Sequence, residues 1–126
     1  MRTAIAVQLK TITDFSNRVF QAYTAPANTA KPYCTFKLTM NDPSVNNMKG
    51  EFLGLQVFIY NTKSTFTTLD GLAKQVKTAL DKVTLTIDDS PARYFRPEYV
   101  RIQADFYDDV ADVFLKRIDF IIPLYR

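Results

Sequence analysis

Apolar and other residues alternate most regularly between positions 51 and 60. The odd positions of this segment are all aliphatic and consist of Leu53, Leu55, Val57 and Ile59. Successive side chains of a β-strand point to opposite faces, so this alternation predicts a strand with one aliphatic face. The other face also carries large apolar side chains, Phe52, Phe58 and Tyr60. The segment is therefore predicted to be a central strand covered on both faces.

Two other segments repeat apolar residues with the period of a helix. Near the start of the chain the apolar positions are Ile5, Leu9 and Ile12, and within 67–83 they are Leu69, Leu72, Ala73, Val76, Leu80 and Val83. These spacings predict a short N-terminal helix and one main amphipathic helix at about 67–83. Thr67 followed by Asp70 resembles a capping box, with a hydroxyl for free N–H groups and an acid near the positive end of the dipole.

Further strands are predicted at 18–23, 33–40, 85–87, 99–107 and 113–125. In 99–107 the alternation places Val100, Ile102, Ala104 and Phe106 on one face, which is typical of a half-exposed strand. The acidic turn at 108–112 separates this strand from 113–125, so the two are predicted to pair as an antiparallel hairpin. Proline and small polar residues predict loops at 24–32, 41–50 and 88–98.

This order of elements predicts an α+β fold, in which a single, largely antiparallel sheet carries the main helix and the short N-terminal helix. With 126 residues, 47% of them hydrophobic, the chain is expected to form one domain over 1–126 with its own core. No apolar run reaches the length of a membrane helix, and the first residues lack the pattern of a signal peptide. The chain is thus expected to be made and kept in a cytoplasm, without a membrane contact.

The net charge of +3 and pI near 9.0 raise the question of nucleic-acid binding. However, the basic residues are dispersed, and the i,i+4 pairs Asp70–Lys74 and Lys77–Asp81 predict a solvated, charge-compensated helix face. The densest basic and aromatic cluster is Arg93-Tyr94-Phe95-Arg96. These residue types stack on bases or dock against proteins, and the cluster alone does not decide between the two.

The residue inventory argues against catalysis. The chain has no histidine and only three glycines, so it lacks the commonest general base and the glycine-rich loops that bind phosphates. The aspartates Asp105, Asp108, Asp109 and Asp112 lack the glycine and the glutamate that complete a calcium loop. Cys34, the one cysteine, lies in an apolar stretch that predicts a half-buried strand position, and we interpret it as a small core residue that reacts slowly with thiol reagents. We therefore predict no catalytic, cofactor or metal site.

Several segments, in this order, resemble the tail-terminator (tail-completion) proteins of long-tailed bacteriophages. They are Arg18-Val19-Phe20, Pro32-Tyr33-Cys34-Thr35-Phe36, the strand 55–61, the helical stretch 69–76 and the closing stretch 106–120. None of them is diagnostic alone. The resemblance rests on their spacing, with a Pro-Tyr strand opening, one amphipathic helix after the long strand and a terminal hairpin with an acidic turn. The loops at 41–50 and 88–98 depart from the expected pattern.

This resemblance implies a structural protein of the virion tail–neck region, made in the cytoplasm of a bacterial host, with no enzymatic activity and no cofactor. In that family the subunits form a hexameric ring that caps the tail tube, ends its polymerisation and offers a surface to the head connector. The implied partners are other copies of the chain, the tail tube protein and the head connector or completion protein. DNA is implied to pass through the ring without sequence-specific binding, and some of Asp88, Asp89, Asp108, Asp109 and Asp112 are expected to face that channel.

Two groups of residues are candidates for contacts. Arg93, Tyr94, Phe95 and Arg96 are candidates for docking to a partner, and Phe114, Phe120 and Tyr125 are candidates for either a subunit interface or the core, at a sheet edge or face near a neighbour. Two other functions stay open at this point. One is another head–tail joining protein of the neck or head-completion type, and the other is a small nucleic-acid-binding module favoured by the pI and by the cluster at 93–96.

Overall fold

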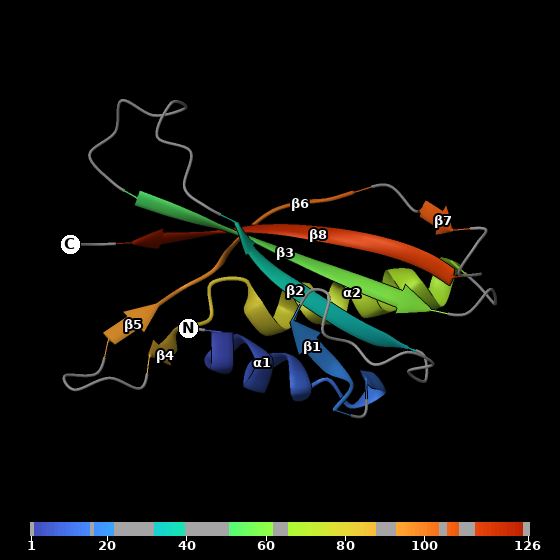
Figure 1. Cartoon of the computed structure of the whole chain (residues 1–126), viewed down its shortest axis with the longest axis horizontal. Helices are drawn as coiled ribbons and strands as arrows, with labels where there is room; N and C mark the ends of the chain where they lie inside the picture. Colours follow the sequence, from blue (N-terminus) through green and yellow to red (C-terminus); the bar gives the residue numbers. More distant parts are fainter. Residues whose placement is uncertain are drawn as a thin grey trace.

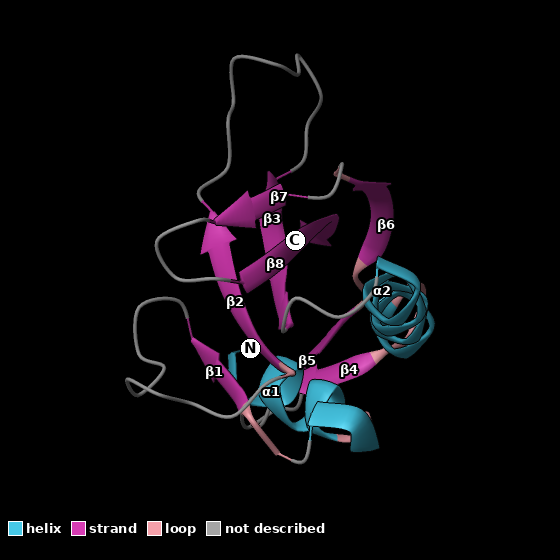
Figure 2. Ribbon diagram, turned by 90° about the vertical axis from the view of Figure 1, so that its right-hand side faces the viewer, coloured by secondary structure: helices cyan, strands magenta, loops and turns pink. Residues whose placement is uncertain are grey.

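The computed structural model describes residues 2–15, 17–21, 32–39, 51–61, 66–87, 93–103, 106–108 and 113–124. These residues form a twisted six-stranded sheet with two helices on one side of it, α1 (Arg2–Lys10) and α2 (Phe66–Leu80), as Figures 1 and 2 show. The predicted α+β class is confirmed. The expectation of a single sheet was incomplete, because β4 (Leu85–Ile87) and β5 (Arg93–Phe95) form a second, two-stranded sheet.

The main sheet has the strand order β1-β2-β3-β8-β6, and β7 also pairs with β8. Its strands are β1 (Val19–Gln21), β2 (Tyr33–Thr39), β3 (Glu51–Asn61), β6 (Glu98–Ile102), β7 (Phe106–Asp108) and β8 (Val113–Leu124). β1 pairs with β2 in parallel, and the other pairings of this sheet are antiparallel. The short helix η1 (Thr13–Phe15) follows α1. The predicted pairing of the last strands is confirmed, although β8 lies inside the sheet and not at its edge.

The aliphatic face of β3 forms the sheet side of the hydrophobic core. Leu55, Val57 and Ile59 are fully buried, and their neighbours across the register, such as Phe36 and Ile118, are buried with them. The helices cover this inner face with Ile5 and Leu9 from α1 and with a larger set from α2. That set is Leu69, Leu72, Ala73, Val76 and Leu80. Each fully buried aliphatic side chain of this kind stabilises the fold by about 1.5–3 kcal/mol relative to an exposed one.

The opposite face of β3 is only half covered. Gly54, Gln56, Phe58 and Tyr60 all have intermediate exposure. The prediction of a strand covered on both faces was therefore wrong for this outer face. Both helices pack on one side of the sheet (Figure 2), so nothing in the described part of the chain forms a second layer over the other side.

The main helix begins and ends earlier than predicted. It begins at Phe66, so Thr67 lies inside the helix and the capping box proposed at Thr67 is wrong. It ends at Leu80, because Lys82 adopts a left-handed backbone conformation with a φ of 58°, which closes many helices. The Lys82 N–H then donates to the carbonyl of Pro97 at 2.8 Å, which ties the helix end to the segment before β6.

The predicted strand 99–107 is interrupted and partly turned over. It consists of two strands, β6 and β7, and both pair with β8. The pairing of β6 with β8 shifts register between Tyr99 and Arg101. This bulge at Val100 adds one residue, so Tyr99 points inward and Val100 is 45% exposed. The predicted alternation was therefore wrong for Tyr99 and Val100, whose sides are exchanged. After the bulge it is correct, and Ile102 packs against the core as predicted.

Asp70 and Lys77 of α2, and Asp81 just after it, contact other elements and not the partners predicted within the helix. Asp70 pairs with Lys116 of β8 at 2.8 Å. The Lys77 amino group lies 4.2 Å from the centre of the Tyr99 ring, and the Asp81 carboxylate accepts the Tyr99 N–H at 2.9 Å. These contacts fasten α2 to β6 and β8, so the predicted pairing within the helix is wrong, whereas Asp70 and Lys74 are exposed as predicted for a solvated face.

The predicted loops at 24–32 and 41–50 lie outside the described residues, apart from Pro32, and so does the acidic turn at 108–112, apart from Asp108. Among the described helices, none has both the length and the apolar character needed to span a membrane.

Cys34 lies in β2 on the inner face of the main sheet and is fully buried, more than the half-buried position predicted. Its backbone N–H donates to the Arg18 carbonyl at 3.1 Å, which begins the parallel pairing with β1. Burial raises the pKa of the Cys34 thiol to about 12, because the surroundings disfavour the thiolate. The structure agrees with the reading of Cys34 as a small core residue.

Two results are expected at Cys34. Labelling by a thiol reagent at pH 8 should be slow and limited by unfolding, since the reactive thiolate is scarce and inaccessible.

The pKa of the Cys34 thiol is higher in the folded state than in the unfolded state. The thiol therefore stabilises the fold fully below pH 9 and progressively less as the pH approaches 12, by roughly 1.4 kcal/mol per pH unit at most. Denaturation of the wild type and Cys34→Ala across this range measures the effect, and a stability difference independent of pH contradicts it.

Candidate docking surfaces

The predicted docking cluster lies on and next to strand β5 of the small sheet, and its side chains point alternately toward the core and toward the surface. Phe95 pairs with Leu85 and both are buried, whereas Tyr94 pairs with the exposed Thr86 and is itself 67% exposed. Arg96 is exposed as well, and Pro97 after it is buried. The side chain of Arg93 lies outside the described part of the structure.

This alternation corrects the prediction that 88–98 is a loop throughout, because Arg93–Phe95 forms β5 and β6 begins at Glu98. Phe95 belongs to the core and holds the small sheet against the body of the protein. Tyr94 and Arg96 remain as the outward pair of the cluster. Their role in docking stays a prediction.

The three candidates predicted on the last strand, Phe114, Phe120 and Tyr125, differ in burial and in whether the structure describes them. Phe120 is 1% exposed and meets Tyr99 edge-on, with 6.3 Å between the ring centroids, so it is a core residue. Phe114 is half-buried against the edge of the core and lies 5.1 Å from the Tyr107 ring of β7. Tyr125 lies outside the described residues.

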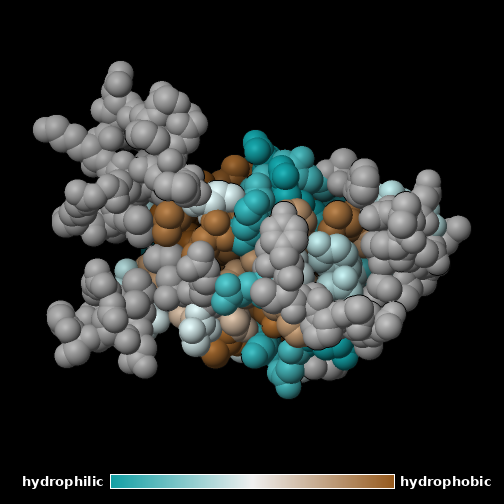
Figure 3. All heavy atoms as spheres, viewed as in Figure 1, coloured by the Kyte–Doolittle hydropathy of each residue, from teal (hydrophilic) through white to brown (hydrophobic). Residues whose placement is uncertain are grey.

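The uncovered outer face of the main sheet holds a polar row that the sequence analysis did not single out. The strand registers place Lys37, Gln56, Asp119 and Arg101 side by side across β2, β3, β8 and β6. Arg117 and Gln103 adjoin this row, since the Gln103 N–H donates to the Arg117 carbonyl at 2.8 Å. We call these six residues the polar belt. Figure 3 looks onto this face and shows a hydrophilic band with hydrophobic atoms on both sides of it.

Asp119 is the centre of the polar belt and its side chain is only 11% exposed. Its Oδ2 accepts from Arg101 Nε at 2.9 Å, from Gln103 Nε2 at 3.2 Å and from Arg117 Nη2 at 3.4 Å. Arg117 Nε lies 3.0 Å from Oδ1, but neither of these two atoms makes a hydrogen bond of good geometry. This contact is therefore an ion pair only. One buried carboxylate thus holds two guanidinium groups on the outer face.

Aromatic side chains flank the belt toward the start of β8. Tyr33 and Tyr60 are directly opposite in the register and stack with centroids 4.7 Å apart and planes 11° from parallel. Phe20 meets Tyr33 edge-on at 6.4 Å. Burial, and to a lesser degree the neighbouring Tyr60, raise the pKa of the Tyr33 hydroxyl. On the other flank lies Ile121, half-buried and paired with Gly54 and Glu98.

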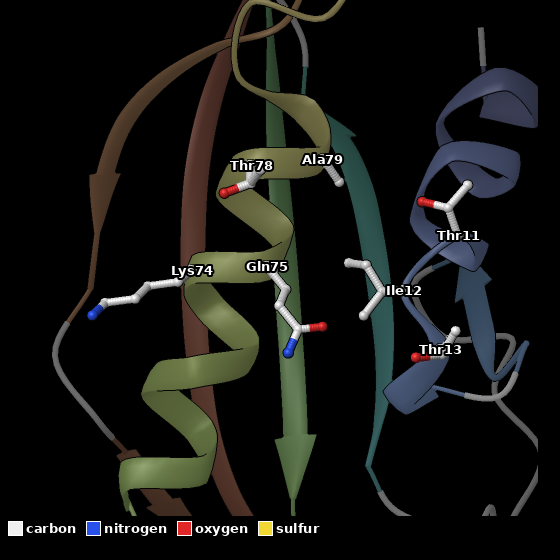
Figure 4. Close-up of a pocket in the computed structure, with 7 residues that line it drawn as sticks. All are labelled: Thr11, Ile12, Thr13, Lys74, Gln75, Thr78 and Ala79. Atoms are coloured by element: carbon white, nitrogen blue, oxygen red, sulfur yellow. The ribbon is translucent and has the colours of Figure 1, made fainter.

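A groove of about 420 Å³ separates the end of α1 from α2 on the helical side (Figure 4). Its residues are Thr11, Ile12, Thr13, Lys74, Gln75, Thr78 and Ala79. Hydrogen bonds from Gln8 to the Ala79 carbonyl and from Gln75 to Asp14 join the two helical segments beside it. In Figure 4, Gln75 points toward Ile12 while the amino group of Lys74 points away from α1.

Catalysis and metal binding each require particular groups close together. The groove presents methyl, hydroxyl and amide groups and the stem of Lys74, and a hydroxyl nucleophile needs an adjacent base for activation. Within the described ranges, no three Cys, Asp or Glu side chains gather as metal ligands do. Three of the four aspartates considered for calcium, Asp105, Asp109 and Asp112, lie outside those ranges.

The sequence carries one sign of the polar belt. Arg117 and Asp119 occupy alternate positions in the most apolar part of 113–125, and Gln56 interrupts the even face of 51–60. Charged residues at alternate positions of an otherwise buried strand indicate that one face of the strand is open. Only the register between the strands brings these charges close together, and the register cannot be derived from the sequence of one strand.

No family model matches the chain, and a search of curated proteins found no match. Among solved structures, a chain of one described as the virion of a native gene transfer agent (GTA) particle matches with a TM-score of 0.65 and 17% sequence identity. The match covers 98% of this chain and 91% of that chain. At this identity the match shows a shared fold.

Proposed function

We propose that this chain is a structural protein of a virion, of the type that terminates the tail. The observation that carries the proposal is the fold match over 98% of the chain to a component of a virion particle. The resemblance of the sequence to tail-terminator proteins supports the finer assignment. In this role the chain forms a ring on the tail tube, ends polymerisation and receives the head connector, without catalysis and without a cofactor.

The surfaces described above support an assembly role. A subunit of a ring between two partners needs contacts to its neighbours and to the structures on either side. Tyr94 and Arg96 project from the small sheet, which Phe95 anchors in the core. Tyrosine and arginine are among the residues that carry most of the binding energy at protein interfaces. We assign these two side chains to the contact with the tail tube or the head connector.

A second candidate function is that of another head–tail joining protein, because the matching structure is described as a whole virion and fits a neck component equally well. The two roles differ in what their loss produces. Without a terminator, tails grow to uncontrolled length, whereas without a neck protein, tails of normal length stay separate from filled heads.

The test is complementation of a particle that lacks this gene. Tyr94→Ser with Arg96→Ser should leave the fold and the soluble yield unchanged, because both side chains are exposed, and should reduce infectious particles at least about tenfold, the equivalent of 1.4 kcal/mol of lost contact energy. Electron microscopy of the products distinguishes long tails from unattached tails. Thr86→Ala, on the same face of the small sheet, is the matched control and should complement fully. Full infectivity of the double variant removes Tyr94 and Arg96 from the docking surface.

A further inference from the structure

The outer face of the main sheet carries a set of apolar and aromatic side chains apart from the core. All of them point outward and are half-buried, and among them are Phe20, Tyr33, Phe58, Tyr60, Leu115 and Ile121. A sheet with helices on one side commonly buries its other apolar face against a further layer. Within the described ranges, both helices lie on the inner side (Figure 2), so a covering layer has to come from another chain.

The edges of this sheet do not invite a further strand. At one edge β1 has only three residues, and at the other β6 carries the bulge at Val100 and the charged Arg101. Short strands, bulges and charges at sheet edges prevent pairing with another chain. A partner is therefore expected to meet the face of the sheet and not its edge.

The outer face has no net charge. Within the paired strands, the registers direct three cations and three acids outward, and these are Lys37, Arg101 and Arg117 with Glu98, Asp108 and Asp119. A nucleic acid or a strongly charged protein thus gains no net attraction from this face. The partner that fits is a neutral face whose separate charges match those of this one.

Two of the outward charges are left over after pairing within the chain. Asp119 pairs with Arg101 and Arg117, whereas Lys37 and Glu98 form no ion pair in the part of the chain that the structure describes. Lys37 is exposed on β2, and Glu98 is half-buried on β6. Because β3 and β8 separate these two strands, three strand spacings of about 14 Å in total keep the two charges apart. They can pair only between copies.

We propose that the outer faces of two copies pack on each other in an isologous dimer. In such a contact each residue meets the same partner twice, once in each direction. A two-fold axis that runs along the strands between β3 and β8 places β2 of each copy over β6 of the other. Lys37 then lies over the row that holds Arg101, one row from Glu98. Neighbouring rows of one face are about 7 Å apart, within reach of the flexible lysine stem.

The size of the face is sufficient for such a contact. Side by side, β2, β3, β8 and β6 are about 19 Å wide and about 17–40 Å long. Two such faces in contact remove on the order of 1,000 Å² from water, the area at which specific interfaces begin. Since an isologous contact closes at two copies, the dimer goes beyond the proposed function, and the contacts of a ring use other surfaces.

The test is self-association, measured by sedimentation between about 1 μM and about 1 mM protein. The wild type should form dimers. Lys37→Glu alone and Glu98→Lys alone should each raise the dissociation constant at least about tenfold, because two attractive pairs become repulsive. An equimolar mixture of the two variants should form heterodimers with a dissociation constant within about threefold of the wild-type value, since every pair again has opposite signs. Lys74→Glu, which changes an exposed cation on α2, is the matched control and should dimerise like the wild type.

Both variants should keep the circular dichroism spectrum of the wild type, so that weaker association reports on the contact and not on unfolding. Several results overturn the proposal. A wild type that is monomeric at every concentration does so, and so does association that neither variant weakens or a mixture no better than its components. If the wild type is monomeric and Lys37→Glu fails to complement a particle that lacks this gene, the face meets a different protein. The complementation test at Tyr94 and Arg96 does not involve this face, so failure of the dimer and failure of the virion role are distinguishable.

Discussion

Replacing Phe120 with aspartate is expected to leave the chain unfolded. The side chain is 1% exposed, packs against Tyr99 and lies opposite Leu55 in the register. Truncating a buried phenylalanine to alanine already costs about 3–5 kcal/mol. An unpaired buried carboxylate costs more, and most domains have only about 5–15 kcal/mol of stability in total. The variant should show no cooperative unfolding transition by circular dichroism and should be largely insoluble.

Ile121→Asp is the matched control for this result. Ile121 follows Phe120 in the same strand but points to the outer face and is half-buried. The control should fold, with a smaller loss of stability, because its carboxylate reaches water. If Phe120→Asp folds normally but fails to assemble, Phe120 is an interface residue and the described core is wrong at this position.

Removing the carboxylate of Asp119 is expected to have the next largest effect. In Asp119→Ala, the two guanidinium groups and the Gln103 amide lose their common acceptor, and two like charges remain close together. Breaking a fully buried pair costs about 3–5 kcal/mol. A loss of about 2 kcal/mol is expected here, because Arg101 and Arg117 keep part of their contact with water.

Urea denaturation measures this loss, and Arg101→Ala provides the comparison. It should cost less than about 1 kcal/mol, since Arg101 is mostly exposed and Asp119 keeps its other partners. Equal losses in the two variants would show that the carboxylate does not organise the belt.

The parts of the fold that follow from local periodicity were predicted well. The strand at 51–61 and the buried stripe of α2 were identified from spacing, since each buries one face of a regular element, and the strand at 33–39 from its aromatic and β-branched residues. The start of α2 was missed by one residue, at Phe66 in place of Thr67, and helix ends are the least certain part of such a pattern.

Features that depend on pairing between distant segments were not predictable in the same way. The bulge at Val100 exists because β6 faces β8, and nothing within 99–107 marks it. The same limit applies to the candidate sites. Arg93 to Arg96 form a contiguous cluster in the sequence, but strand pairing with β4 sends Phe95 inward and Tyr94 outward. The polar belt joins residues of four strands and has no counterpart in any one segment.

The position of β8 in the sheet has a consequence for the order in which the protein acquires its structure. β8 is the last of the described strands to leave the ribosome, yet it lies between β3 and β6, which are synthesised before it. Until it emerges, the aliphatic face of β3 lacks its main neighbour and one edge of β3 stays unpaired, a state prone to aggregation. We therefore expect nascent chains halted before residue 113 to be captured by chaperones or degraded. Such fragments would then be removed early, and only chains synthesised beyond β8 would accumulate as folded protein.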